Sequence, residues 1–261
     1  AIADLQIAYL NGYIGKHRET VKVLQHYYKN TELLSKQDIE NIRMNLADRY
    51  LDIKEYDKSL NLIKEGLNEA QNSGENIRYH KYLNLLGCYY LKTGKFQEAI
   101  MNLEKCKIFF IENKLDFDAS YALLYLGDAY ASLDDKEQAA ENFITIDLII
   151  ERTSNTFPEL REVYTYLIHY YKERKDKEKQ LYYIDRFLRI DSVLDSQFRY
   201  ISQEIPNKYD TPKLLSEKEE IIADLTKKRL FSYAAIGILI SMLVTLLYLF
   251  IKSKRKEHKY K

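Results

Sequence analysis

The sequence contains no tryptophan, three prolines and eight glycines among its 261 residues. Because proline and glycine interrupt regular structure, their scarcity favours long helices joined by short turns. Neither sign of charge is in excess, since 40 Lys and Arg balance 39 Asp and Glu to give a net charge of +1. The chain as a whole therefore carries no electrostatic field that would draw it to nucleic acid or to an acidic partner.

Cysteine and histidine are too sparse to build a metal site or a catalytic centre. The two cysteines are too few for a structural zinc site, and the five histidines have no ligand spacing. We expect Cys88 and Cys106 to be free, buried thiols on opposite arms of one helical hairpin that turns near Gly94. The stretch "GYIGKH", from Gly12 to His17, is too short for a phosphate loop and fits the turn of another hairpin. The sequence predicts no enzyme, no metal and no cofactor.

A long uncharged run lies near the C-terminus. Leu230 to Ile251 covers 22 residues without a charge, and 13 of them are Leu, Ile, Val or Phe. As a helix this run would be about 33 Å long, and the hydrocarbon core of a bilayer is about 30 Å thick. A buried core helix is the alternative, but such helices rarely run this long without a polar face. We predict a single transmembrane helix over residues 230–251, followed by a basic tail over 252–261.

Before this run, a pattern of residues repeats every 40 positions. The pair Leu46-Ala47 recurs as Leu86-Gly87 and as Leu126-Gly127. Each pair is followed by a tyrosine and then by a small residue, in the order Tyr50, Ser59; Tyr90, Ala99; Tyr130, Ala139. A weaker copy contains Leu167, Tyr171, Ile184 and Phe187, and a partial copy near the N-terminus contains Ile7, Ala8 and Leu24. One hairpin cannot cover its own apolar face, so the copies must stack. The sequence predicts an all-α solenoid of antiparallel helical hairpins.

The order Leu-Gly, Tyr, Ala and then an aromatic or aliphatic residue resembles the tetratricopeptide repeat (TPR) family. The resemblance covers about residues 1–190, with roughly six residues more per hairpin than the usual 34. It departs at Asn11, which replaces the tyrosine, and at Ile168 and Gln180, which replace small residues. We assign residues 1–205 to this domain. The resemblance implies a role in protein–protein interaction.

Repeat arrays usually bind partners on the concave face, which the first helix of each hairpin lines. The aligned positions that we expect to be exposed there are Asn45, Asp48, Asn84, Cys88, Tyr125, Asp128, Tyr166 and His169. Their amide and aromatic groups suit an extended peptide or a protein segment. The set lacks the cations of a chaperone-type carboxylate clamp, for which Lys81 is the single candidate. A solvated surface without a ligand is the alternative.

Residues 206–229 form a linker and juxtamembrane segment. Thr211 is a candidate cap, and Pro212 suits the first helical position. An apolar stripe of Leu214, Ile221, Ile222 and Leu225 predicts a helix that runs from about residue 212 into the membrane span. "YDTPKLLSEKEEI", followed by one span and a Lys-rich exit, resembles membrane-bound regulators of Bacteroidetes. That resemblance implies TPRs outside the cytoplasm and a cytoplasmic helix-turn-helix domain of the arabinose-regulator type. DNA would then be bound only through a domain that this chain lacks.

The basic residues beside the span indicate an orientation. Four Lys or Arg precede the span and six follow it, which favours a cytoplasmic tail and periplasmic repeats in a bacterial inner membrane. The tail would also contact anionic lipid headgroups. A tail-anchored scaffold with cytosolic repeats is the alternative. Since the first residue is Ala rather than Met, we expect the natural N-terminus to be missing or processed.

Three small residues recur every four positions within the span. Gly237, Ser241 and Thr245 would let two copies of the helix approach closely and exchange hydrogen bonds. This stripe predicts a homodimer, with chance placement in an apolar run as the alternative.

Overall fold

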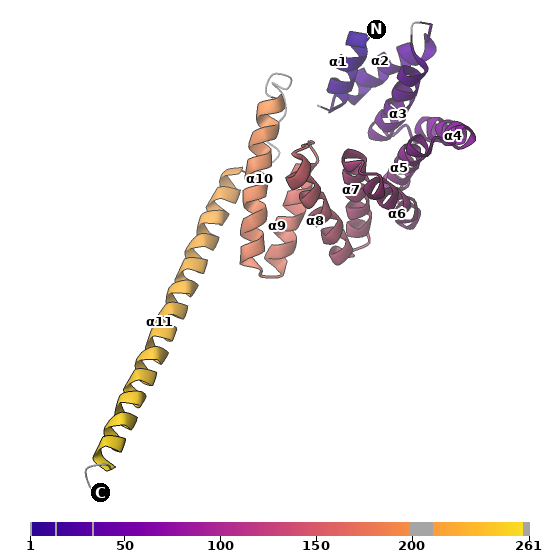
Figure 1. Ribbon diagram of the computed structural model, residues 1–261. Coiled ribbons are helices and arrows are strands. Elements are labelled where there is room, and N and C mark those ends of the chain that lie inside the picture. The colour runs from indigo at the N-terminus through magenta and orange to yellow at the C-terminus, as the bar shows by residue number, and fades with distance from the viewer. Residues whose placement is uncertain (1, 14, 33, 199–210, 258–261) are drawn as a thin grey trace.

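The computed structural model describes residues 2–13, 15–32, 34–198 and 211–257 (Figure 1). Those residues form eleven α-helices, and no strand occurs among them. The prediction of an all-α chain is therefore confirmed.

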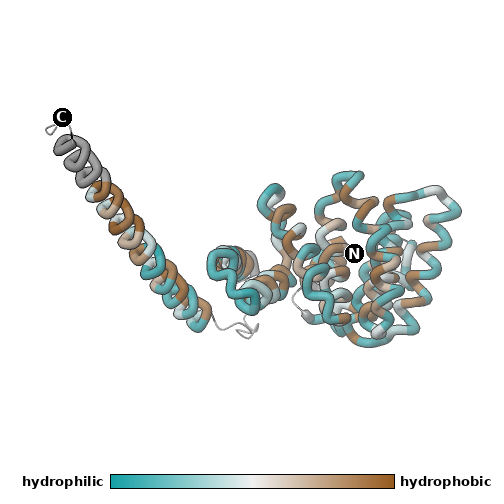
Figure 2. The backbone as a smooth tube through the Cα atoms, turned by 90° about the horizontal axis from the view of Figure 1, so that it is seen from below, coloured by the Kyte–Doolittle hydropathy of each residue, from teal (hydrophilic) through white to brown (hydrophobic). Residues whose placement is uncertain are grey.

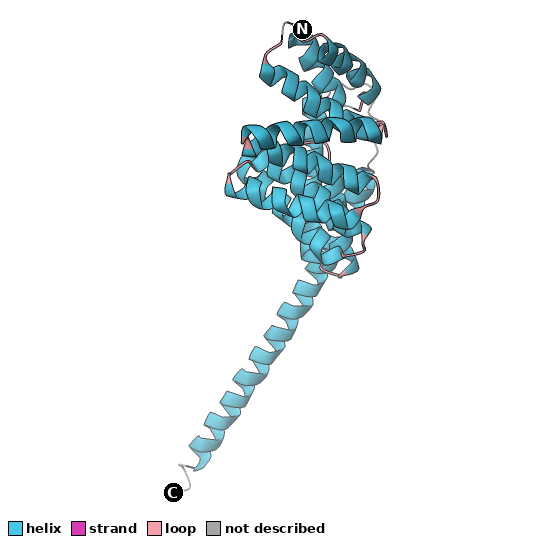
Figure 3. Ribbon diagram, turned by 90° about the vertical axis from the view of Figure 1, so that its right-hand side faces the viewer, coloured by secondary structure: helices cyan, strands magenta, loops and turns pink. Residues whose placement is uncertain are grey.

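The first ten helices pair into five hairpins that stack along a curved array (Figures 1 and 3). In chain order the helices are α1 (Ile2–Tyr13), α2 (His17–Lys29), α3 (Lys36–Asp52), α4 (Tyr56–Ser73), α5 (Asn76–Lys92), α6 (Phe96–Glu112), α7 (Asp116–Ser132), α8 (Lys136–Thr153), α9 (Leu160–Glu173) and α10 (Lys177–Phe198). The three clear repeats form α3–α8, the weaker copy forms α9–α10 and the partial copy forms α1–α2. The solenoid inferred from the 40-residue period is confirmed.

Small residues allow the two helices of each hairpin to approach closely, as their recurrence predicts. A Cβ placed on Gly127 of α7 would lie 2.3 Å from Cε1 of Phe143 on α8. The same position in α3 is Ala47, whose carbonyl accepts a hydrogen bond of 2.7 Å from the hydroxyl of Ser59. The repeated small residues thus mark the closest approach of the paired helices.

The turns inside the hairpins use one backbone conformation. Gly94, between α5 and α6, has a φ of 77°. Forty residues earlier and later, Lys54 and Asp134 adopt nearly the same left-handed conformation, with φ values of 63° and 60°. Side chains rarely take this conformation because the Cβ crowds the backbone. The fold therefore imposes the turn even where the sequence supplies no glycine.

A buried polar network joins the fifth hairpin to the fourth. Asp147 of α8 and Arg186 of α10 are 3% and 9% exposed at their side chains, and they form an ion pair of 2.6 Å. The hydroxyl of Tyr164 on α9 donates to Asp147 at 2.8 Å. This network ties α8, α9 and α10 together across the longer connection of residues 154–159.

The last helix, α11 (Thr211–Glu257), is continuous over 47 residues. Its first part packs on the solenoid, where Ile221 is buried and Leu214 and Leu225 are partly buried. Ile222 is 42% exposed, so its predicted place in the apolar stripe is wrong. From Leu230 to Leu246 the described side chains are exposed, and this part of the helix projects away from the repeats (Figures 1 and 2).

Both cysteines lie where the sequence predicts. Cys88 is on α5 and Cys106 is on α6, so they occupy opposite arms of one hairpin, and both are free and buried. The "GYIGKH" stretch spans the turn between α1 and α2, where Gly15 has a φ of 84°. Both interpretations from the sequence are confirmed.

Candidate functional site

The first helices of the second, third and fourth hairpins, α3, α5 and α7, lie against one another on the inside of the curve. Helix α3 contacts α5, and α5 contacts α7, whereas no comparable contact joins α4 to α6 or α6 to α8 in the part of the chain that is described. Stacked hairpins approach most closely on their concave side. We call the side chains that α3, α5, α7 and the start of α9 present there the inner face.

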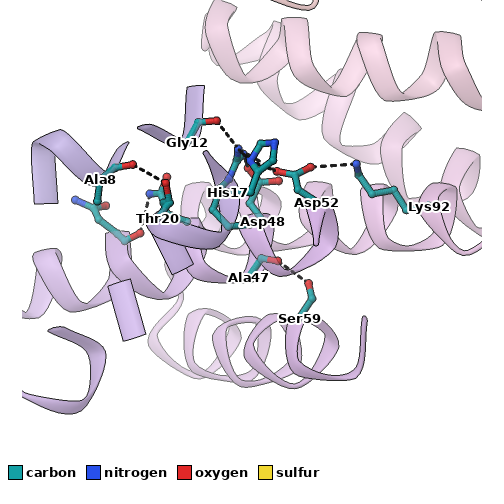
Figure 4. A network of polar contacts seen from close by, with 12 residues as sticks. Ala8, Gly12, His17, Thr20, Ala47, Asp48, Asp52, Ser59 and Lys92 are labelled. Atoms are coloured by element: carbon teal, nitrogen blue, oxygen red, sulfur yellow. Dashed lines mark hydrogen bonds and ion pairs between the residues drawn. The ribbon is translucent and has the colours of Figure 1, made fainter. Parts of the chain in front are cut away.

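A polar network occupies the N-terminal end of the inner face (Figure 4). Arg49 of α3 donates from Nη1 to the carbonyl of Gly12 at 3.1 Å, and it pairs with Asp52 at 3.0 Å and with the neighbouring Asp48. Lys92 of α5 also pairs with Asp52, at 3.2 Å. These contacts fix the first three hairpins to one another and neutralise both cations.

His17 completes this network. Its Nδ1 lies 3.1 Å from Nη1 of Arg49 and 3.3 Å from Oδ2 of Asp52. Burial lowers the pKa of the imidazole, and the Arg49 charge acts in the same direction, whereas Asp52 opposes them. A neutral imidazole can accept a hydrogen bond from the guanidinium. His17 therefore supports Arg49 at neutral pH.

Two of the predicted inner-face residues are not exposed. Cys88 is fully buried and Asn84 is only 9% exposed, because α3 and α7 cover this side of α5. Burial raises the pKa of the Cys88 thiol to about 12. A protonated, enclosed thiol is neither a nucleophile nor a metal ligand at neutral pH. The expected exposure of Asn84 and Cys88 is wrong.

Two other predicted residues, both on α7, do face the interior of the curve. Tyr125 is half-buried, and its pKa is raised by burial and by the charges of neighbouring acidic groups. Asp128 keeps an exposed side chain. The loss of part of its solvation, together with the charges of Glu162 and Glu159, raises the pKa of Asp128 to about 7, and the charge of Lys92 opposes the rise. A carboxylate of this kind titrates near neutrality.

On α3, Asn45 and Asp48 are both half-buried. The Asn45 amide donates to the carbonyl of Asn41 at 2.8 Å, so one of its donors is used within α3. The charge of Asp48 raises the pKa values of Cys88 and Tyr125. The structure thus brings Asp48, Cys88 and Tyr125 into one electrostatic neighbourhood.

Tyr166 and His169 do not join this neighbourhood. The ring of Tyr166 packs edge-on against Phe143 of α8, with centroids 4.9 Å apart. His169 is exposed and lies one helical turn before Glu173, at the C-terminal end of α9.

The start of α9 contributes residues that the repeat alignment missed. Glu159 is half-buried, and its Oε2 is buried without a hydrogen-bond partner. Burial raises its pKa, and so do the charges of Asp48 and Glu162. The charge of Asp48 acts on Glu159 although α3 and α9 belong to different repeats, and the charge of Arg49 acts against it. The one feature of the sequence that indicates where α9 begins is the stretch "FPEL", with proline just before a helix.

One helix in the described residues is long and apolar enough to cross a membrane. The candidate segment is Thr211–Leu246, and its most apolar window has no surface buried by the rest of the protein. Gly237 has no atom within 4 Å of a Cβ placed on it, and Ser241 is exposed. The hydroxyl of Thr245 donates to the Ser241 carbonyl at 2.8 Å. The predicted dimer stripe therefore lies on an open helix surface. The last residues of the basic tail, 258–261, lie outside the described residues.

No family model matches this sequence, and a search of curated proteins finds no match. Solved structures do match. A Rap protein complexed with competence and sporulation factor gives a TM-score of 0.64 at 16% identity, over 85% of this chain and 63% of that one. RapI in its apo form gives 0.57 at 12% identity, over 88% and 85% of the two chains.

A third structural neighbour is a signal transduction ATPase with numerous domains from Pyrococcus horikoshii, which carries a tetratricopeptide repeat sensor. It gives a TM-score of 0.57 at 16% identity, over 86% of this chain and 35% of that one. This chain thus spans less than two thirds of two of these neighbours. At such identities the likeness concerns the fold, and it confirms that the repeats form a TPR-like α-solenoid.

Proposed function

We propose that this protein is a membrane-anchored TPR sensor that binds a peptide or protein partner on its inner face. One observation carries the proposal: α11 is a single helix whose first part packs on the last repeat and whose later part is apolar and exposed. A rigid helix of this kind can pass a shift in the repeats to the other side of a membrane. The resemblance to Bacteroidetes regulators supports a cytoplasmic DNA-binding domain as the receiver.

The contacts between α11 and the last hairpin support this coupling. Lys172 and Lys177 pair with Glu217 and Asp224 of α11 at 2.5 Å and 2.7 Å. Lys218 of α11 pairs with Asp185 at 2.6 Å. These ion pairs surround the buried Ile221, so a movement of α10 would move the start of the helix that leads into the membrane.

Thiol labelling tests the proposed orientation. We expect Asn76→Cys, on the exposed start of α5, to react with an impermeant thiol reagent in intact spheroplasts if the repeats are periplasmic. The unchanged protein is the matched control, because burial of Cys88 and Cys106 keeps both thiols from an impermeant reagent. Labelling that requires lysis would instead support the tail-anchored cytosolic scaffold, which is the second candidate function.

Fractionation tests the anchor itself. The full chain should sediment with membranes and require detergent for release, because its exposed apolar helix has no protein cover. A chain ending at Arg229 should remain folded and soluble, since the solenoid core and the buried part of α11 are retained. Recovery of the full chain as a soluble species without detergent would contradict the proposed membrane anchor.

Self-association tests the proposed dimer stripe. Gly237→Leu should abolish association of the span in a membrane assay, because a large side chain at that position separates the helices. Ala235→Leu, on the opposite side of α11, is the matched control and should leave association intact. If both variants self-associate to the same extent, the spacing of Gly237, Ser241 and Thr245 is due to chance.

Sequencing the gene beyond the codon for Lys261 tests the proposed output. A helix-turn-helix domain there would support the regulator, and a stop codon would favour the scaffold.

A further inference from the structure

We infer that a further helical hairpin, formed by residues of the same chain that precede Ala1, stacks on the outer side of α1. This interaction surface lies at the N-terminal end of the solenoid, so it is independent of the proposed ligand binding and of the membrane anchor. Three observations support it: the apolar side chains that α1 exposes, their register in the repeat, and the cover that the same positions have in later hairpins.

Helix α1 is apolar on two opposite sides. Leu5 and Ala8 are buried and pack in one cluster with residues of α2 and α3. Ala3, Ile7 and Leu10 follow one another at spacings of four and three residues, so they form a stripe on the other side of the helix. All three are exposed, Ile7 to 57% and Leu10 to 45%. Since a helix that is apolar all round is typically buried, we call these three residues the uncovered stripe.

A hydrogen bond inside the first hairpin fixes the register of α1 against the later repeats. The hydroxyl of Thr20 on α2 donates to the carbonyl of Ala8 on α1 at 3.0 Å. The hydroxyl of Ser59 on α4 donates in the same way to the carbonyl of Ala47 on α3, at 2.7 Å. Both donor and acceptor are shifted by 39 residues between the two hairpins (20 to 59 and 8 to 47). The same shift therefore relates every residue of α1 to its equivalent in α3.

The equivalents of the uncovered stripe in α3 are buried by the preceding hairpin. Ala3 corresponds to Ile42 and Ile7 corresponds to Leu46, and these two residues of α3 are 0% and 2% exposed. Helix α3 packs on α2, and both residues belong to one apolar cluster with Leu24 of α2. The second helix of the hairpin before it thus covers this side of α3.

The next two hairpins repeat this arrangement. In α5, Tyr82 takes the position of Ala3, and a Cβ placed on Gly66 of α4 would lie 2.1 Å from the Cζ atom of its ring. In α7, Leu126 takes the position of Ile7 and is buried in one cluster with Leu103 of α6. The uncovered stripe is therefore shaped to receive the second helix of a preceding hairpin, and continues the interface that already joins the repeats.

The opposite end of the solenoid already has its cover. The first part of α11 packs on α10, with Ile221 buried and Leu214 and Leu225 partly buried. Helix α1 ends the stack on the other side, and no helix in the described part of the chain covers its stripe (Figure 1). Successive hairpins are joined by short connections, such as residues 74–75 and 113–115. A hairpin encoded directly before α1 would therefore place its second helix on the stripe.

Reading the gene upstream of the codon for Ala1 is the first test. We expect about 40 in-frame codons that encode two amphipathic helices joined by a short turn. The second of these helices should end within a few residues of Ile2. A start codon or a secretory leader directly before Ala1 would overturn the inference.

A substitution in the uncovered stripe measures the cover directly. In the gene product with its upstream residues, Ile7→Gln should lower the unfolding temperature in detergent by about 4 °C or more, because it buries an amide in the interface. In the chain that begins at Ala1 it should have almost no effect, since Ile7 is exposed there. Ile77→Gln, at another exposed isoleucine on α5, is the matched control and should have almost no effect in either protein. An equally small effect of Ile7→Gln in both proteins would overturn the inference.

The oligomeric state distinguishes a preceding hairpin from a second copy of the chain. Sedimentation in detergent compares the gene product with and without Ile7→Gln, both carrying Gly237→Leu to remove association through the span. We expect the same mass for both proteins, because the cover belongs to the same chain. A dimer that Ile7→Gln dissociates would identify a second copy as the occupant and overturn the inference.

Discussion

The leucines of the solenoid and those of the later part of α11 lie in helices of the same kind but in opposite surroundings. Leu46 and Leu167 are 2% and 0% exposed, whereas Leu239 and Leu243 are 63% and 68% exposed. In the repeats, each apolar stripe is covered by the next hairpin. In α11, nothing in the described protein covers the apolar surface. The difference shows that the stacking of hairpins, not helix formation, removes the leucines of the repeats from water. The apolar part of α11 needs another environment to cover its leucines.

The first test of this comparison removes the buried ion pair of the solenoid, which has no equivalent among the described residues in the later part of α11. Asp147→Leu should lower the free energy of unfolding by about 3–5 kcal/mol, because it removes the buried partner of the Arg186 guanidinium and leaves only the longer contact with Glu151, at 3.8 Å. Urea unfolding of the chain ending at Arg229 would measure it. Glu173→Ala, which removes the exposed pair with Lys136, is the control and should cost less than about 1 kcal/mol. A small effect at Asp147 would mean that water reaches this network.

The same substitution, of glycine by alanine, should have different consequences in the two regions. Gly127→Ala should destabilise the solenoid by about 1–3 kcal/mol, because the new Cβ would meet the Phe143 ring. Gly237→Ala meets no atom, and alanine favours a helix by up to about 1 kcal/mol over glycine. It should therefore leave solenoid unfolding unchanged. Thermal unfolding in detergent compares the two, and equal effects would contradict the packing explanation.

A charge on α11 should affect the membrane and not the fold. Leu239→Arg places a guanidinium near the centre of the proposed span, where it costs about 2.5–3.5 kcal/mol for insertion. We expect less membrane-inserted protein in a glycosylation-type insertion assay and no change in the unfolding of the repeats. Leu239→Val is the control. Unchanged insertion of the Arg variant would argue that α11 lies outside the bilayer.

The smallest expected effect concerns Asp128, whose pKa is raised in the folded state by lost solvation, by Glu162 and by Glu159, while Lys92 acts against the rise. Between about pH 4 and pH 7 the folded state binds more protons than the unfolded state, so this group reduces stability as the pH rises. Asp128→Asn should therefore stabilise the protein at pH 8, by less than about 1 kcal/mol after solvent screening.

The effect of the same variant should shrink toward about pH 3, where the carboxyl is largely neutral in both states. Unfolding curves of both proteins at pH 4, 6 and 8 would check the trend. A stability difference that is constant with pH would mean that Asp128 titrates in its ordinary range.

Much of the fold could be predicted from the sequence because its determinants are local and repeat. The pairs Ala47 with Ser59 and Gly127 with Phe143 stand at fixed spacings in each copy, so the period alone locates the helices and their closest approach. Thr211 and Pro212 place the start of α11 within a residue. The candidate site was less predictable, because its contacts join different hairpins, as those of Arg49 with Gly12 and of Lys92 with Asp52 do.

The sequence by itself determined which segments are helical, how they pair and where the uncharged run begins, since these depend on propensity and on contacts within one hairpin. Only the tertiary structure decided that Cys88 is enclosed while Asp128 is open, that Ile221 rather than Ile222 packs on the last repeat, and that Arg49 donates to the Gly12 carbonyl of another hairpin. Those outcomes depend on how successive hairpins rotate against one another, and that rotation arises from side-chain packing between residues far apart in the chain.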